Sequence, residues 1–158
     1  MTHISDEIAE VVSELCIAAE RLAPKSTHIL RNRLHDKFGL DLNHFSIYVE
    51  GRVESIHDKD AWLWIDQFTA DSELILLFPK SNEPDGWRFP DGETLVKVLA
   101  ECSGFVFIVT NSNTEFLLAF DDHDCLIGAG TSANWIRSLV LQSENESELT
   151  SYCVWLRT

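Results

Sequence analysis

The stretch FVFIVTNSNTEFLLAFDDHDCLIGAG, residues 105–130, decides the fold. It holds three apolar runs, at 105–110, 115–120 and 125–130, and polar segments of four residues separate them. Connections this short join neighbouring antiparallel strands, so the stretch predicts a β-meander. Apolar residues occupy both alternating sets of positions in the first run, which indicates central strands with both faces covered.

The segments before and after the meander favour helices. Apolar residues at helical spacing predict one helix from Ser5 to Leu22, ended by Pro24, and a second from Ser26 or Thr27 to Gly39. We therefore expect one α+β domain over 1–158, an antiparallel meander with two amino-terminal helices and further helices packed on it. The remaining expected elements are a strand at 45–49, a short helix at 60–68, a strand at 73–80, a surface loop at 79–92, helices at 91–104 and 132–140, and an edge strand at 152–156.

The chain is strongly acidic. Its 26 Asp and Glu residues against 12 Lys and Arg residues give a net charge of −14, yet 45% of the residues are hydrophobic, enough for a packed core. The resulting negative field repels nucleic acid and attracts basic proteins. We expect a basic protein partner and no nucleic-acid partner.

The lack of a recognisable secretory signal or membrane span, together with the cysteine pattern, predicts a cytoplasmic protein. The amino terminus carries acids where a secretory signal has bases, and no apolar run approaches the ~18 residues of a membrane span. We therefore expect a cytoplasmic location and no membrane partner. The cysteines are widely spaced with no CxxC pair, which predicts buried free thiols at Cys16, Cys102, Cys125 and Cys153.

Two acidic clusters contain histidine, HDKD at 57–60 and DDHD at 121–124. Carboxylates and imidazole suit a divalent metal or acid–base catalysis. However, both clusters lie in predicted turns and neither has a metal-ligand spacing, so we expect no metal and no cofactor. The second cluster, Asp121, Asp122, His123 and Asp124, is interpreted as a solvated turn or a protein-contact loop, with a metal-dependent hydrolase as the alternative.

Other candidates for partner contact lie outside the meander. Trp87 and Arg88 follow Gly86 in a Gly- and Pro-containing loop, where an aromatic residue either anchors a partner or folds back over the core. Glu144, Glu146 and Glu148 form an acidic run without a base. Nucleophile, phosphate-binding and dinucleotide-binding motifs are absent, so no residue is assigned as catalytic. On the second helix, Arg31, Arg33 and Lys37 are interpreted as a solvated basic face.

The strand 116–120, the acidic histidine-bearing turn and the small-residue strand 126–130, with helices on either side, resemble a group of small bacterial proteins. These proteins are encoded beside polymorphic or contact-dependent toxins and resemble immunity proteins, which neutralise a toxin by binding it. The resemblance covers about the second half of the chain. It implies a cytoplasmic protein that occludes the active site of a cationic toxin, such as a nuclease. A generic protein-interaction module is a further alternative.

Overall fold

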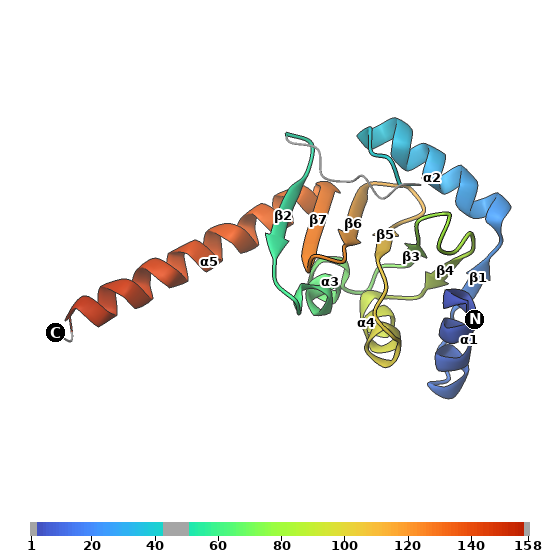
Figure 1. Cartoon of the computed structure of the whole chain (residues 1–158), viewed down its shortest axis with the longest axis horizontal. Coiled ribbons are helices and arrows are strands. Elements are labelled where there is room, and N and C mark those ends of the chain that lie inside the picture. Colours follow the sequence, from blue (N-terminus) through green and yellow to red (C-terminus); the bar gives the residue numbers. More distant parts are fainter. Residues whose placement is uncertain (1–2, 43–50, 157–158) are drawn as a thin grey trace.

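The computed structural model describes residues 3–42 and 51–156, with side chains up to residue 145. Within this part the strands form one antiparallel sheet of order β1-β4-β3-β5-β6-β7-β2 (Figure 1). The α+β class is therefore confirmed. The strands are β1 (Glu20–Leu22), β2 (Glu54–His57), β3 (Leu74–Leu77), β4 (Gly86–Phe89), β5 (Phe107–Thr110), β6 (Phe116–Phe120) and β7 (Cys125–Gly130).

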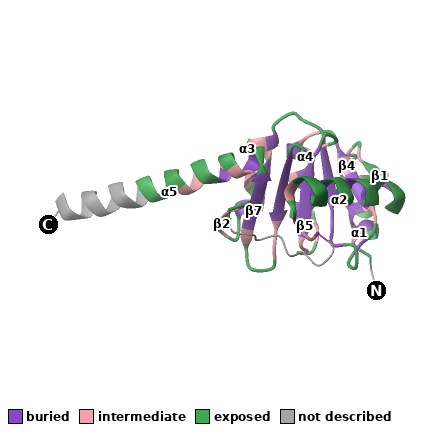
Figure 2. Ribbon diagram, turned by 90° about the horizontal axis from the view of Figure 1, so that it is seen from above, coloured by how far each residue is buried: buried purple, intermediate pink, exposed green. Residues whose placement is uncertain are grey.

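Helices cover both faces of the sheet, as the meander pattern predicts. In β5, Ile108 packs in the core beneath α2, whereas Phe107 and Val109 pack in the core shared with the other helices. Figure 2 shows the resulting buried sheet between exposed helix surfaces. The helices are α1 (Ile4–Glu14), α2 (Pro24–Phe38), the 3-10 helix η1 (Ala61–Trp64), α3 (Ile65–Thr69), α4 (Gly92–Glu101) and α5 (Thr131–Leu156).

The predicted meander holds for β5, β6 and β7, which pair consecutively through Phe107 with Phe120 and Phe120 with Leu126. The rest of the sheet is not a meander, because β3 lies beside β5 and the earlier strand β2 closes the edge beside β7. The short helix at 60–68 is confirmed as η1 followed by α3. Asp91 caps α4 as expected, its carboxylate accepting from the Thr94 amide at 2.8 Å.

The first predicted helix is too long. It ends at Glu14, Cys16 takes a left-handed φ of 54°, and the chain then forms β1. Pairing of Leu22 with Gly86 gives this segment hydrogen-bond partners that local helical spacing does not reveal. The same pairing explains why the predicted loop at 79–92 contains strand β4.

The predicted edge strand at 152–156 is also wrong, because α5 continues through Leu156. After Gly130 the sequence has no Gly or Pro to end a helix. Cys16 is exposed rather than buried, and Cys102 and Cys125 are partly buried; all three thiols are unpaired. The predicted strand at 45–49 and the side chain of Cys153 lie outside the described residues.

Helix α5 begins on the sheet and then leaves it. Its start packs closely because β7 carries Gly128, where an added Cβ would lie 2.7 Å from the Ile136 Cδ1 atom. Ser132 does not cap the helix with its side chain; its hydroxyl donates to the carbonyl groups of Leu117 and Ala129. Figure 1 shows the rest of α5 running away from the body. Across the described part of the chain, no helix has the length and apolarity needed to cross a bilayer.

Candidate functional site: an acidic end beside an aromatic pocket

The two acidic histidine-bearing turns lie side by side at one end of the sheet. Strand β2 ends at His57, which pairs with Cys125 at the start of β7. One residue on, the Asp58 amide donates to the Asp124 carbonyl oxygen at 3.0 Å. Segments more than sixty residues apart thus form one surface, here called the acidic end. It consists of His57, Asp58, Lys59, Asp60, Asp121, Asp122, His123 and Asp124.

Within the β6–β7 turn, the acids have different roles. The Asp121 carboxylate accepts hydrogen bonds from the amides of His123 and Cys125, both at 2.9 Å, and so holds the turn. Asp124 takes a left-handed φ of 59°, which Asp tolerates better than most residues. Asp122 and His123 project into solvent, with side chains 78% and 82% exposed. Asp121 therefore shapes the turn, and Asp122 displays its charge.

The neighbouring β2–η1 turn repeats this division. Asp58 accepts from the Asp60 amide at 2.8 Å and so shapes the turn. The Asp60 side chain is exposed and makes no capping hydrogen bond to η1. Asp60 and Asp122, like the exposed Asp124, are thus carboxylates without a structural backbone contact.

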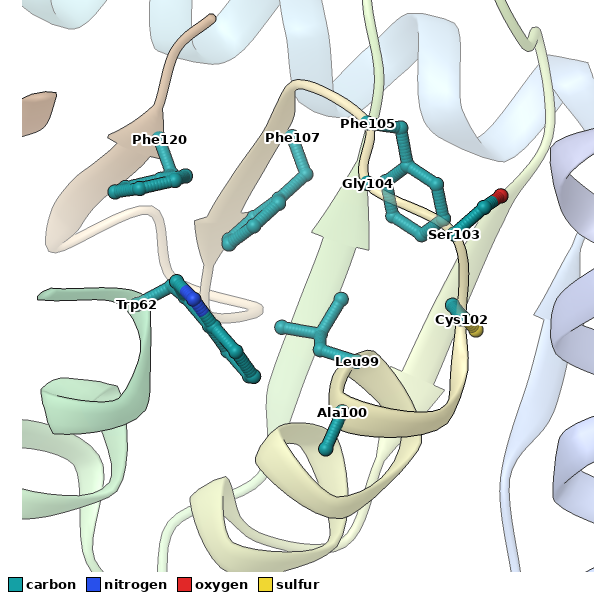
Figure 3. A pocket seen from close by; sticks show the side chains of 9 residues that line it. All are labelled: Trp62, Leu99, Ala100, Cys102, Ser103, Gly104, Phe105, Phe107 and Phe120. Carbon is teal, nitrogen blue, oxygen red and sulfur yellow. The ribbon is translucent and has the colours of Figure 1, made fainter. Parts of the chain in front are cut away.

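An aromatic pocket of about 270 Å³ lies at the same end of the sheet. Figure 3 shows Trp62, Phe107 and Leu99 pointing toward one another from η1, β5 and α4. Phe120 stacks on Phe107 with ring centroids 6.1 Å apart and an angle of 28° between the ring planes. The lining residues are Trp62, Leu99, Ala100, Cys102, Ser103, Gly104, Phe105, Phe107 and Phe120.

The pocket and the acidic end are continuous along the chain. Phe120 immediately precedes Asp121, and Trp62 follows Asp60 by two residues. The pairing of Phe107 with Phe120 places the start of β5 beside the same turn. One surface therefore combines an apolar cavity with a group of carboxylates.

A further carboxylate supports the opposite wall of the pocket. Glu7 of α1 accepts hydrogen bonds from both the amide and the hydroxyl of Ser103, the latter at 2.8 Å. Partial burial, aided by the negative charges of Glu7 and Glu101, raises the pKa of the Cys102 thiol to about 11. Cys102 therefore stays mostly protonated at neutral pH and is a weak nucleophile there.

The second thiol of this region experiences the same kind of field. Burial, together with the carboxylates of Asp121 and Asp124, raises the pKa of Cys125. Cys125 packs against the core on the α2 side of the sheet, so these two carboxylates act on the face opposite the pocket. Among the described side chains, those of residues 3–42 and 51–145, no three from His, Cys, Asp or Glu are grouped to hold a metal ion.

Trp87 and Arg88 lie far from this surface, in β4. Trp87 is only 4% exposed, and its indole Nε1 atom donates to the Ser5 hydroxyl, so it packs in the core instead of anchoring a partner. Arg88 is engaged within the chain, with its guanidinium 2.7 Å from the Glu20 carboxylate and 3.1 Å from that of Glu73.

The acidic run of the carboxyl-terminal segment is separate as well. Glu144 is exposed on α5. Glu146 and Glu148 belong to the same helix, but their side chains lie outside the described residues. Of the predicted contact residues, the structure brings together the turn 121–124, which it joins to 57–60.

Sequence reasoning missed the pocket because its aromatic residues look like ordinary core positions. Their position in the sequence carries a signal nonetheless. Phe120 and Trp62 each stand at the boundary between an apolar element and an acidic turn. An aromatic side chain at such a boundary lies at the rim of the core, where it borders solvent and charge.

Comparison with protein-family models, curated proteins and solved structures finds no match for this chain. Its function must be inferred from the geometry of the acidic end and the pocket.

Proposed function

We propose that this chain is a binding protein that recognises a basic protein through its acidic end, and that it acts as an immunity protein against a cationic toxin such as a nuclease. The observation that carries the proposal is the joining of two distant acidic turns beside an aromatic pocket, through the Asp58 to Asp124 hydrogen bond. Neutralisation would occur by occlusion of the toxin's active site.

Charge and shape contribute differently to such binding. Exposed carboxylates with complementary charge on the partner mainly raise the association rate, because they steer the encounter over a distance of about 10 Å at ordinary salt. Aromatic pockets hold the side chains that contribute most of the affinity. The acidic end and the pocket supply both on one surface.

A metal-dependent hydrolase built on the turn 121–124 has less support. Asp121 is engaged with two backbone amides. Asp122 and His123 are exposed and lie 3.6 Å apart, but among the described side chains no third ligand is grouped with them. A generic interaction module would use the same surface as an immunity protein, so the partner's nature distinguishes these two.

The test uses the protein encoded immediately upstream of this chain. Its carboxyl-terminal domain is expressed in bacterial cells with and without the chain, and growth is measured. The binding rates of the purified pair are then measured over a range of salt concentrations. The variant carries Asp60→Lys and Asp122→Lys. The matched control carries Asp36→Lys and Asp71→Lys, the same charge change at exposed acids of α2 and the α3–β3 turn.

We expect the chain to restore growth, the association rate to fall steeply with salt, and the Asp60 and Asp122 variant to lose about 2–5 kcal/mol of binding free energy. The control should bind nearly as the parent does. Growth arrest that the chain does not relieve, or an association rate indifferent to salt, would contradict the proposal. Binding without growth arrest would support the generic interaction module.

A further inference from the structure

We infer that the aromatic pocket receives an arginine side chain of the basic partner. The inference rests on the proposed function and adds to it the chemical group that the pocket selects.

The size of the pocket fits one side chain. Its volume of about 270 Å³ falls below the roughly 300–1,000 Å³ typical of sites for drug-sized ligands. Leu99, Phe105 and Phe107 provide apolar surface against which a long alkyl stem can pack. The charged end of such a stem would remain near the mouth, where the field is negative.

The lining also suits a cation with a flat face. Aromatic rings attract cations through their negative faces, tryptophan most strongly, and a guanidinium stacks on a ring better than an ammonium does. The indole of Trp62 borders the cavity, and the Glu7 carboxylate is hydrogen-bonded to Ser103 in the opposite wall, so a bound guanidinium could contact the ring in a pocket that a carboxylate borders. No lining residue is Lys or Arg.

Charge complementarity decides between occupants. The Glu7 carboxylate accepts hydrogen bonds from Ser103 in the wall of the pocket, and the charges of Glu7 and Glu101 add to burial in raising the pKa of the lining residue Cys102. A neutral apolar side chain would gain nothing from this field. A second copy of the chain carries the same net charge of −14 and would be repelled.

The first experiment compares three end-capped tripeptides, Gly-Arg-Gly, Gly-citrulline-Gly and Gly-norleucine-Gly. Citrulline has the shape of arginine without its charge, and norleucine supplies only an alkyl stem. Binding is followed by the Trp62 indole N–H signal in NMR spectra and by the rate of Cys102 alkylation. We expect the arginine peptide to shift the signal saturably and to slow alkylation, with at least about tenfold weaker binding of the other two.

The second experiment uses Trp62→Leu, with Trp64→Leu as the matched control. Trp64 lies in the same 3-10 helix and is also partly buried, but it does not line the pocket. Thermal unfolding establishes that both variants fold. Trp62→Leu should abolish the arginine-dependent change in Cys102 alkylation and weaken partner binding at least tenfold, chiefly through faster dissociation. Trp64→Leu should leave both nearly unchanged.

The outcomes separate this inference from the proposed function. Equal binding of the arginine and citrulline peptides, tightest binding of norleucine, or no binding of any peptide would overturn the arginine assignment. Partner binding that Trp62→Leu leaves intact, while Asp60→Lys with Asp122→Lys weakens it, would also overturn it and leave the proposed function standing. A partner whose binding neither variant changes would contradict both.

Discussion

Two charged regions of this molecule show opposite uses of charge. The first region is a buried pair of charges, Arg31 and Glu83, which lies between α1, α2 and the loop at 79–85 and is here called the hub. Each of the two residues is only 4% exposed. The Arg31 guanidinium donates to the carbonyl groups of Phe78, Glu83 and Pro84 and to the Thr27 hydroxyl, at 2.8–3.3 Å. At the acidic end, by contrast, Asp60 and Asp122 are exposed and lack structural backbone partners.

The contrast has a physical origin. Burial lowers the pKa of Arg31, and the nearby Glu83 charge opposes that change, so each charge of the hub compensates the other. The Glu83 carboxylate also accepts from the Ser5 amide at 2.8 Å. Buried charges must be satisfied inside the protein, whereas exposed charges keep their hydration and remain available to a partner. The hub therefore contributes to stability, and the acidic end is the surface that we propose for recognition.

The largest effect on stability is expected from a substitution that disrupts the hub. Arg31→Met removes the guanidinium and leaves the buried Glu83 charge uncompensated, so we expect a loss of about 3–5 kcal/mol in the free energy of unfolding, measured with urea. Arg33→Met is the control, because Arg33 lies on the exposed side of α2 and donates to the Ser112 carbonyl at the surface. A loss below about 1 kcal/mol for Arg31→Met would show that the hub is not structural.

A smaller effect is expected in alkaline solution. The folded-state pKa of Cys102 rises from 9.0 to about 11, so the unfolded chain releases this proton first as pH increases. The folded state gains stability relative to high pH from holding this proton more tightly than the unfolded chain does. This contribution is fully present below about pH 9 and is lost between about pH 9 and 11. Because Cys102 is partly exposed, we expect clearly less than the ~2.7 kcal/mol that such a rise represents.

Comparison with Cys102→Ala isolates this contribution from other groups that titrate at high pH. The difference in unfolding free energy between parent and variant should change across this pH interval and remain constant below it. Alkylation of Cys102 should also accelerate about tenfold with each pH unit up to about pH 11, since only the thiolate reacts. A difference that is constant from pH 7 to 11 would contradict the raised pKa of Cys102 and its origin in burial and the nearby carboxylates.

The sequence predicts those parts of the fold that form between residues close together in the chain, and it does not predict those that need distant segments to pair. Strands β5 to β7 follow from neighbouring apolar runs and short turns. Strand β4 does not, because its partner β1 lies more than sixty residues earlier in the chain. The burial of Arg31 was missed for the same reason. Its helix position resembles those of Arg33 and Lys37, and only the loop at 79–85, folding over it, distinguishes it.

The site shows the same limit. The turn at 121–124 was interpreted from its composition as a solvated turn or a protein-contact loop. Its position beside the turn at 57–60 could not be predicted, because that position depends on β2, which precedes β3 in sequence, pairing with β7 at the far edge of the sheet. The pocket draws its walls from η1, α4, β5, β6 and the segment after α4, an arrangement that no local pattern encodes.

Replacing a carboxylate with the corresponding amide should change the free energy of unfolding in opposite directions in the hub and in the acidic end. Glu83→Gln removes a buried charge that compensates Arg31 and should lower the unfolding free energy. Asp60→Asn with Asp122→Asn removes exposed like charges and should leave it unchanged or raise it by up to about 1 kcal/mol, more at low salt than at high salt. Urea unfolding at two salt concentrations measures both. Destabilisation of similar size by both changes would erase the distinction between the hub and the acidic end.

The smallest effect is expected at His123, which distinguishes charge from histidine chemistry within the acidic end. Its Nε2 atom lies 3.6 Å from the Asp122 carboxylate, but the His123 and Asp122 side chains are 82% and 78% exposed, so the pair contributes little to stability. His123→Ala should change the unfolding free energy by no more than about 0.5 kcal/mol and leave partner binding within about threefold at neutral pH. Binding titrations at neutral pH, with Asp122→Ala alongside, test this directly. Asp122→Ala should weaken binding more, because it removes a carboxylate that steers the basic partner, whereas a dominant loss in His123→Ala would transfer the recognition role from the acids to the imidazole.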